Sequence, residues 1–174
     1  NPDPSTKSIN APLYLSNNFQ YDEEIYRNIV EGARITENIY GRCGNPNETL
    51  LQEQVAMLEN ADGCLALGSG MAAVATTCLA LLRPGDHIVS DWTTYSSTHE
   101  MFDHRLTDFG IETTFVDCND IETVKKAIKA NTKILYFETI ANPNMRVTAI
   151  SPLVKLARDN DLLVICDNTF ASPY

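Results

Sequence analysis

Leu162-Leu163-Val164-Ile165-Cys166-Asp167-Asn168-Thr169 is the segment whose pattern points most directly to an architecture. Four apolar residues lead through a cysteine into a carboxylate, and polar turn residues follow. Such a run predicts a buried strand that ends at Asp167. Because open α/β sheets bind their ligands at the carboxyl ends of the strands, Asp167 is expected at a ligand-binding edge. A carboxylate that caps the following turn explains the same residue equally well.

Apolar runs of strand length alternate with segments of helical spacing upstream of this segment. Strands are predicted at 64–67, 87–90, 111–116, 134–137 and 162–166, and helices at 47–59, 71–82, 95–107, 121–130 and 152–160. Asn47 is the predicted N-cap of the first of these helices. Strands that alternate with helices of about ten residues form βαβ units. The sequence therefore predicts an α/β fold, with a mostly parallel sheet and helices on both faces.

The first 45 residues do not follow this alternation, because they are polar and their scattered apolar residues have no clear period. They predict an extended N-terminal arm with one short helix near residues 22–31. Long irregular segments usually pack against something, and a neighbouring subunit is one candidate. The predicted organisation is an arm at 1–45 that contacts a neighbouring subunit, and at 46–174 the first part of the sheet domain.

The composition predicts a soluble globular protein. The 174 residues are 44% hydrophobic and 21% charged, and the formal net charge is −10. Nucleic acid is not expected as a partner, because its phosphates would be repelled. Apolar runs such as Leu79 to Leu82 are far shorter than the roughly 20 residues of a membrane span. The first residues show no signal-peptide pattern, and no membrane association is expected.

The five cysteines indicate a reducing, cytoplasmic setting. Their number is odd and no two are spaced as C-x-x-C, so neither a disulfide framework nor a zinc ribbon is predicted. Cys64, Cys78 and Cys166 lie among apolar residues and are expected in the core. The three histidines show no metal-ligand spacing with the cysteines, and no metal site is predicted.

A glycine-rich segment, Gly68-Ser69-Gly70-Met71, lies between a predicted strand and a predicted helix. The unpaired N–H groups at the start of a helix and its positive dipole end form a phosphate cradle. A purely structural turn explains the segment equally well. It matches neither G-x-x-x-x-G-K-[ST] nor G-x-G-x-x-G, because Ala73 stands where the third glycine of the latter belongs.

Three further candidates each have an ordinary explanation of their own. Tyr95 follows the strand at 87–90, and its ring is suited to lie over a planar ligand, although packing alone accounts for it. Asn142 follows the strand at 134–137, where helix caps and Asx-turns are common. Tyr40 and Arg42 share a glycine-rich loop; Arg binds phosphate through two parallel hydrogen bonds, but a solvated surface loop is the simpler explanation.

The strongest indication of a ligand site is that these candidate residues occur together, because each residue alone has an ordinary explanation. Gly70, Tyr95, Asn142 and Asp167 each follow a different predicted strand, and parallel strands bring such residues to one edge of a sheet. Together they offer a phosphate site, a stacking face, a hydrogen-bond donor and an acid.

In this order the motifs resemble the Cys/Met-metabolism family of pyridoxal-phosphate (PLP) enzymes. The resemblance runs from about Pro12 to Tyr174. It is carried by Tyr40-Gly41-Arg42 with Asn45-Pro46, Ser69-Gly70-Met71-Ala72-Ala73, Pro84-Gly85-Asp86-His87, Asn142-Pro143 and Asp167-Asn168-Thr169-Phe170. It implies the large domain of the aspartate aminotransferase fold (type I) of PLP-dependent transferases.

The resemblance also implies roles for single residues. Two are catalytic: Tyr95 stacks on the pyridine ring and shuttles a proton, and Asp167 pairs with the ring nitrogen and keeps it protonated. A protonated ring is a better electron sink, and a paired carboxylate in a buried site favours its charge. The implied cofactor-binding set is Tyr40, Arg42, Ser69, Gly70, Met71, Tyr95, Asn142, Asp167 and Thr169.

Within this set, the backbone N–H groups of Gly70 and Met71 are expected to bind the cofactor phosphate. Tyr40 and Arg42 are expected to reach a phosphate in the neighbouring subunit of a homodimer or homotetramer. Asn142 is expected near the ring hydroxyl.

The implied function is that of a carbon–sulfur lyase of methionine and cysteine metabolism. Such an enzyme acts on methionine, homocysteine or cystathionine-type substrates by α,γ-elimination. Thr98-His99-Glu100-Met101-Phe102 is similar to the methionine γ-lyase branch, but Ser96-Ser97-Thr98 departs from the Gly-Cys-Thr usual there. A γ-replacement enzyme, such as cystathionine γ-synthase or O-acetylhomoserine sulfhydrylase, therefore stays open. So do a non-catalytic fragment that only dimerises or binds cofactor, and a nucleotide-binding α/β domain.

The family's Schiff-base lysine is expected in a Ser-x-Thr-Lys segment beyond Asp167, and none of the lysines present stands in that context. The expectation is that this chain is the N-terminal part of a longer protein, and that it is inactive as a lone polypeptide.

Overall fold

The computed structural model describes residues 6–33 and 38–173. It divides into two compact units, Asn1–Ala66 and Leu67–Tyr174, and each is described by itself. The predicted division after residue 45 stays a prediction, and its parts at 1–5, 34–37 and 174 lie outside the described residues.

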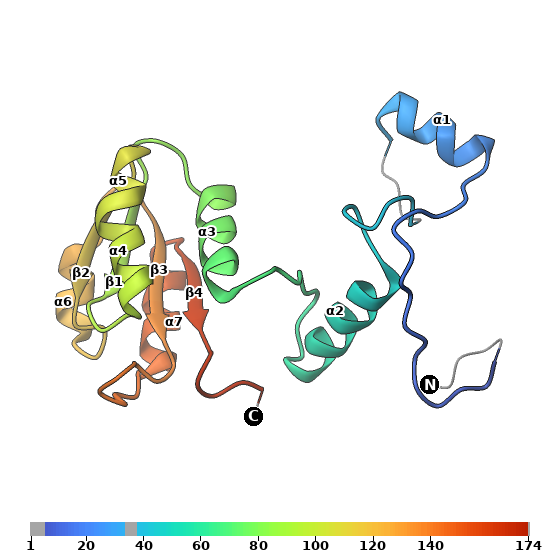
Figure 1. The fold of residues 1–174 in the computed structure, drawn as a ribbon. Helices are drawn as coiled ribbons and strands as arrows, with labels where there is room; N and C mark the ends of the chain where they lie inside the picture. The colour runs from blue at the N-terminus through green and yellow to red at the C-terminus, as the bar shows by residue number, and fades with distance from the viewer. Residues whose placement is uncertain (1–5, 34–37, 174) are drawn as a thin grey trace. The chain divides into compact units, whose positions relative to one another are not determined.

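The second unit contains a parallel sheet of four described strands (Figure 1). The strands are β1 (His87–Asp91), β2 (Glu112–Val116), β3 (Thr132–Glu138) and β4 (Leu163–Asp167). Their order is β2-β1-β3-β4, and each neighbouring pair is parallel. The chain passes from β1 to β2 on one side, and then crosses to β3 on the other side of β1. The topological switch point, where α/β sheets open a crevice for ligands, therefore lies between β1 and β3.

Helices cover both faces of this sheet, as predicted. They are α3 (Gly70–Leu81), α4 (Ser96–Glu100), the π-helical segment η1 (Met101–Arg105), α5 (Leu106–Asp108), α6 (Ile121–Ala127) and α7 (Ile150–Asp159). Side chains alternate along β3, so Ile134 and Tyr136 pack with Cys78 of α3 and Phe102 of η1. On the other face, a second cluster contains Leu135, Phe137, Val124 of α6, and Leu153 and Ala157 of α7. The predicted fold class is confirmed.

Several predicted elements differ from the observed ones. Residues 64–67 form no strand, because this short apolar run has no paired neighbour within its unit. The predicted helix at 95–107 begins at Ser96 and is interrupted by η1. The N-cap of α2 (Pro46–Leu58) is Asn45 rather than Asn47, and the Asn45 side chain accepts the Asn47 N–H at 2.9 Å.

The burial expected for the strand at 162–166 and for the cysteines is also corrected. β4 is not a buried strand, since it is an edge strand of the described sheet and Leu163 and Cys166 are exposed. Of the three cysteines expected in the core, Cys78 is buried and Cys64 is half-buried. In α3, Cys78 is the only buried residue.

The first unit contains α1 (Glu23–Glu31), close to the predicted short helix, and α2. An isolated antiparallel bridge joins Asn18 to Tyr40. The Asn47 side chain donates to the Tyr14 carbonyl at 2.8 Å. None of the described residues of this unit is buried.

Candidate functional site

A cavity of about 460 Å³ opens at the carboxyl edge of the sheet in the second unit. Its volume lies within the roughly 300–1,000 Å³ typical of small-molecule sites. Seven of the nine predicted cofactor-binding residues line it, namely Ser69, Gly70, Met71, Tyr95, Asn142, Asp167 and Thr169. The structure thus brings residues from the ends of β1, β3 and β4 together, as predicted, and adds the start of α3, which no strand precedes in the structure.

The first wall of the cavity is the start of α3. Ser69 is its N-cap, and the Ser69 hydroxyl accepts the Ala72 N–H at 3.1 Å. Among the described residues, no acceptor meets the N–H groups of Gly70 and Met71. A Cβ built on Gly70 meets no atom within 4 Å, so the backbone there faces open space. Free N–H groups at the positive end of a 12-residue helix can hold an anion.

Asp167 combines the two roles that the sequence left open. Its Oδ1 accepts the Thr169 N–H at 3.0 Å and the Thr169 hydroxyl at 2.5 Å, which caps the turn after β4. Its Oδ2 accepts the Tyr136 hydroxyl at 3.4 Å, and the residue lines the cavity. The hydrogen bonds that cap the turn therefore also hold the Asp167 carboxylate in the wall of the cavity.

Tyr136 is a supporting residue that the sequence reasoning did not single out. Its side chain is fully buried, and its ring packs edge-on against Phe102 with centroids 4.9 Å apart. Burial raises its pKa, and the nearby Asp167 charge raises it further, so the hydroxyl keeps its proton and remains a donor. Its spacing two residues before the strand-ending Glu138 could have indicated an inward-facing partner.

Glu138 is the second carboxylate of the cavity, and it was absent from the predicted set. It ends β3 and pairs in register with Asp167 of β4. The side chain is 6% exposed, and its Oε1 accepts the Tyr95 N–H at 2.5 Å. Burial raises the pKa of Glu138, and the Asp167 charge adds to the effect. Its position directly after the predicted strand at 134–137, at the carboxyl edge of the sheet, is the sequence signal that marks it.

Tyr95 lies directly before α4 and also lines the cavity. The residue is 43% exposed, so it is not an ordinary core residue. The sequence left packing and ligand stacking open, and this exposure favours stacking.

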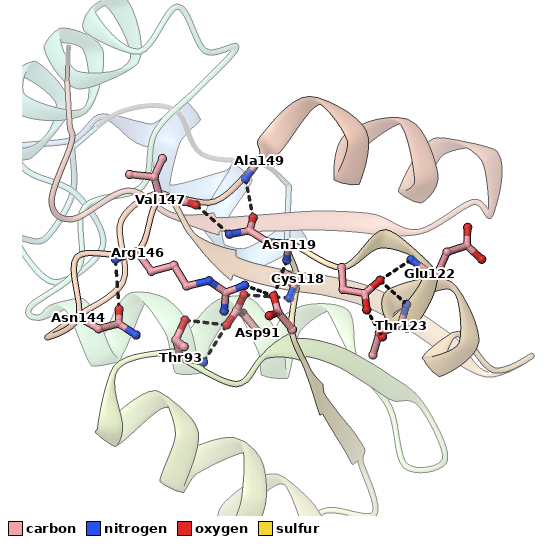
Figure 2. A network of polar contacts seen from close by, with 12 residues as sticks. Asp91, Thr93, Cys118, Asn119, Glu122, Thr123, Asn144, Arg146, Val147 and Ala149 are labelled. Atoms are coloured by element: carbon pink, nitrogen blue, oxygen red, sulfur yellow. Dashed lines mark hydrogen bonds and ion pairs between the residues drawn. The ribbon is translucent and has the colours of Figure 1, made fainter.

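Asn142 lies in a loop that side chains from other strand ends hold in place. The loop closes on itself, since the Ala141 N–H donates to the Arg146 carbonyl at 2.9 Å. Figure 2 shows the surrounding network, in which the Asn119 side chain donates to the Val147 carbonyl and accepts the Ala149 N–H, both at 2.9 Å.

The same network reaches the loop that follows β1. The Arg146 guanidinium forms an ion pair with Asp117. Nearby, Asp91 is 3% exposed and its Oδ1 accepts the Thr93 N–H and hydroxyl, each at 2.7 Å (Figure 2). These contacts fix the backbone on both sides of the switch point.

Tyr40 and Arg42 belong to the first unit, and their predicted role stays a prediction. The Arg42 guanidinium carbon lies 4.8 Å from the centroid of the Tyr40 ring. This cation–π contact holds the two side chains together.

No helix in the described parts of the chain, 6–33 and 38–173, has the length and apolar character needed to cross a bilayer.

The family described as Cys/Met metabolism PLP-dependent enzyme matches residues 1–174. The L-methionine gamma-lyase of Fusobacterium nucleatum subsp. nucleatum is 42% identical over 168 residues, which are 96% of this chain and 42% of that protein. The cystathionine beta-lyase MetC of Bacillus subtilis is 45% identical over 134 residues, 77% of this chain and 34% of that protein.

A solved structure of a putative O-acetylhomoserine (thiol)-lyase from Campylobacter jejuni contains N′-pyridoxyl-lysine-5′-monophosphate. It superposes with a TM-score of 0.90 at 29% identity, and the match covers 98% of this chain and 42% of that chain. The present chain thus spans about two fifths of the length of the first curated relative.

Proposed function

Because the chain belongs to the Cys/Met metabolism family of PLP-dependent enzymes, we propose that the protein is a carbon–sulfur lyase of sulfur amino-acid metabolism. Its substrates are methionine, homocysteine or cystathionine-type amino acids, and the reaction is α,γ-elimination. One observation carries the proposal: a free helix start, an aromatic ring and a carboxylate line one cavity at the switch point. The 42% identity to a protein named L-methionine gamma-lyase supports this substrate class.

The residues of the cavity fit PLP, because each polar part of that cofactor has a chemical counterpart. The unpaired N–H groups of Gly70 and Met71, with Ser69 beside them, suit a phosphate. The accessible ring of Tyr95 suits a flat aromatic ligand, and the Asn142 amide suits a ring hydroxyl. Asp167 supplies the negative charge that a protonated ring nitrogen needs.

When bound, PLP acts as an electron sink for the charge that develops at the substrate Cα. Asp167 favours a proton on the ring nitrogen, and its contacts with Thr169 and Tyr136 hold the carboxylate in place for this task. Tyr95 covers a ring face, and its hydroxyl is available to move a proton. The start of α3 anchors the phosphate end, which prevents the ligand from rotating away from the acid.

The neighbouring subunit completes the site in this proposal. Tyr40 and Arg42 bind the phosphate in the adjacent subunit of a homodimer or homotetramer, and the arm at residues 1–45 packs on that subunit. Their mutual contact pre-orders a guanidinium that binds phosphate through two hydrogen bonds.

One sequence feature leaves a second candidate function open, because the segment at residues 96–98 matches neither the methionine γ-lyase pattern nor the Gly-Gly-Thr of many γ-synthases and sulfhydrylases. Ser96-Ser97-Thr98 departs from the Gly-Cys-Thr pattern of the methionine γ-lyase branch, and Ser97 takes the place of the thiol. The alternative is γ-replacement. In that reaction a thiol or sulfide takes the place of the γ-substituent, whereas elimination removes the substituent and puts nothing in its place.

The full-length protein with PLP tests both functions. Methionine and water are expected to yield methanethiol, ammonia and 2-oxobutanoate in equal amounts, measured by thiol and 2-oxo acid assays. A product that forms only when O-acetylhomoserine is supplied together with sulfide would establish γ-replacement instead. A full-length protein without the visible absorbance of bound PLP would refute both.

A further inference from the structure

Glu138 is a buried carboxylate to which the proposed chemistry assigns no task. It ends β3, opposite Asp167 in the register of β4, and lines the same cavity. Only 6% of the residue is exposed. Buried carboxylates need hydrogen-bond partners, so the groups that donate to Glu138 indicate what its side chain does in the structure.

Those donors are backbone groups of two different loops. The Tyr95 N–H, in the loop after β1, donates to Glu138 Oε1 at 2.5 Å. The Asn142 backbone N–H, in the loop after β3, acts on the same carboxylate and opposes the rise in its pKa. Tyr95 and Asn142 are the cavity residues expected to contact the ring face and the ring hydroxyl. One side chain therefore ties together the backbone of two cavity walls.

We propose that Glu138 is a positioning residue that holds the Tyr95 and Asn142 loops at the separation the cofactor ring requires. The proposal rests on the proposed function for its consequence at the cofactor. The tie itself exists in the protein without cofactor. Glu138 touches neither the substrate nor the reacting atoms in this role, and it acts through Tyr95 and Asn142.

The acceptor oxygens, rather than the charge, are the part of Glu138 that this role needs. Burial and the neighbouring Asp167 both raise the pKa of Glu138, which opposes ionisation. A carboxylic acid or an amide still presents a carbonyl oxygen to an N–H group. Reach matters more, because a side chain one methylene shorter withdraws its oxygens from both donors.

The matched variants Glu138→Gln and Glu138→Asp separate these two properties. Gln keeps the length and one acceptor oxygen but removes the charge, whereas Asp keeps the charge and loses the reach. Glu138→Ala removes both. Glu122→Gln serves as the control, because Glu122 is an exposed residue at the start of α6.

The first measurement is amide hydrogen exchange at Tyr95 and Asn142 in the full-length protein without PLP. Exchange is expected to rise about tenfold or more in the Ala and Asp variants, because the buried N–H groups lose the acceptor oxygen that protects them. The rise is expected to stay several times smaller in Glu138→Gln and to be absent in Glu122→Gln. Unchanged exchange at Val89, in the core of β1, verifies that each variant is folded.

The second measurement is the circular dichroism of bound PLP, which responds to the orientation of the ring. The Asp variant is expected to change this signal more than the Gln variant does. Unchanged exchange in both the Ala and Asp variants would overturn the proposal. So would a Gln variant that loses turnover while its exchange and dichroism match wild type, since Glu138 would then act through its charge. If the wild-type protein binds no PLP, the proposed function fails. The exchange experiment still tests whether Glu138 holds the Tyr95 and Asn142 loops in place.

Discussion

The two units of this chain differ in how they bury apolar side chains. In Leu67–Tyr174, two clusters of buried residues lie on opposite faces of the parallel sheet. Among the described residues of Asn1–Ala66, none is buried, and large side chains such as Tyr26 of α1 and Leu58 of α2 are exposed. The sheet unit therefore supplies its own hydrophobic stabilisation, whereas the first unit relies on local contacts.

Those local contacts are helix caps and polar side chains. Asp22 accepts the Ile25 N–H at 3.0 Å at the start of α1, and Asn45 caps α2. A cap contributes about 1 kcal/mol, which does not stabilise a short helix without an apolar face to bury. The difference teaches that the cavity geometry is set within the sheet unit.

The largest expected effect is on the stability of the sheet unit. Phe102 is fully buried against Tyr136, so Phe102→Ala is expected to lower the free energy of unfolding by about 4–5 kcal/mol. Met57→Ala in α2, an exposed position outside the arm, is expected to change it by less than about 0.5 kcal/mol, as for other surface substitutions. Urea unfolding of the full-length protein measures both, and equal losses would contradict the comparison.

The next effect is on catalysis within the sheet unit. Asp167→Ala removes the anion expected beside the ring nitrogen, and turnover in the full-length enzyme is expected to fall at least about 10³-fold, or about 4 kcal/mol. Asp108→Asn, an exposed change at the end of α5, serves as the control. Steady-state kinetics with methionine measures the loss. Retained activity in the Asp167 variant would refute the assignment of this carboxylate.

The smallest effect is a pH dependence of stability that belongs to the sheet unit alone. His87 is fully buried between the hydroxyls of Thr132 and Thr114, both at 2.8 Å. Burial lowers its pKa from the ordinary value of 6.5, and Lys129 lowers it further. His87 therefore binds a proton more weakly in the folded protein than in the unfolded chain.

Stability is therefore fully present above pH 6.5 and falls as the pH drops below it, by up to about 1.4 kcal/mol per pH unit until the folded pKa is reached. Urea unfolding of the cofactor-free protein between pH 7.5 and 5.5, which is about one unit on either side of the ordinary histidine pKa, measures this slope. The slope is expected to flatten in His87→Gln and to persist in the exposed variant His104→Gln. A slope that survives His87→Gln would show that another group is responsible.

The sequence predicted the four strands of the sheet well, because each is an apolar or alternating segment long enough to pair with a neighbour. It failed at residues 64–67, where a run of similar composition forms no strand. Local pattern carries no information about pairing partners, and a strand exists only when its N–H and C=O groups find them. For the same reason, the edge position and exposure of β4 were not visible in its apolar sequence.

The candidate site divides in a similar way. Gly70, Tyr95, Asn142 and Asp167 were predictable, because each follows a strand or opens a helix and parallel strands share one carboxyl edge. Glu138 and Tyr136 were not in the predicted set, since their importance comes from contacts with residues 29 to 43 positions away. Local position marks the two residues as lying near the sheet edge, but it does not identify the distant residues that they contact.

The sequence by itself determined the α/β alternation, the family and the edge of the sheet that carries the chemistry. The alternation and the edge depend on composition and period over short segments, where side-chain hydrophobicity and backbone geometry act locally, and the family was recognised from its resemblance to known motifs. Only the tertiary structure decided which carboxylate caps a turn while facing the cavity and which one ties two loops together. Such roles depend on burial and on hydrogen bonds between distant residues, and these exist only once the chain has folded.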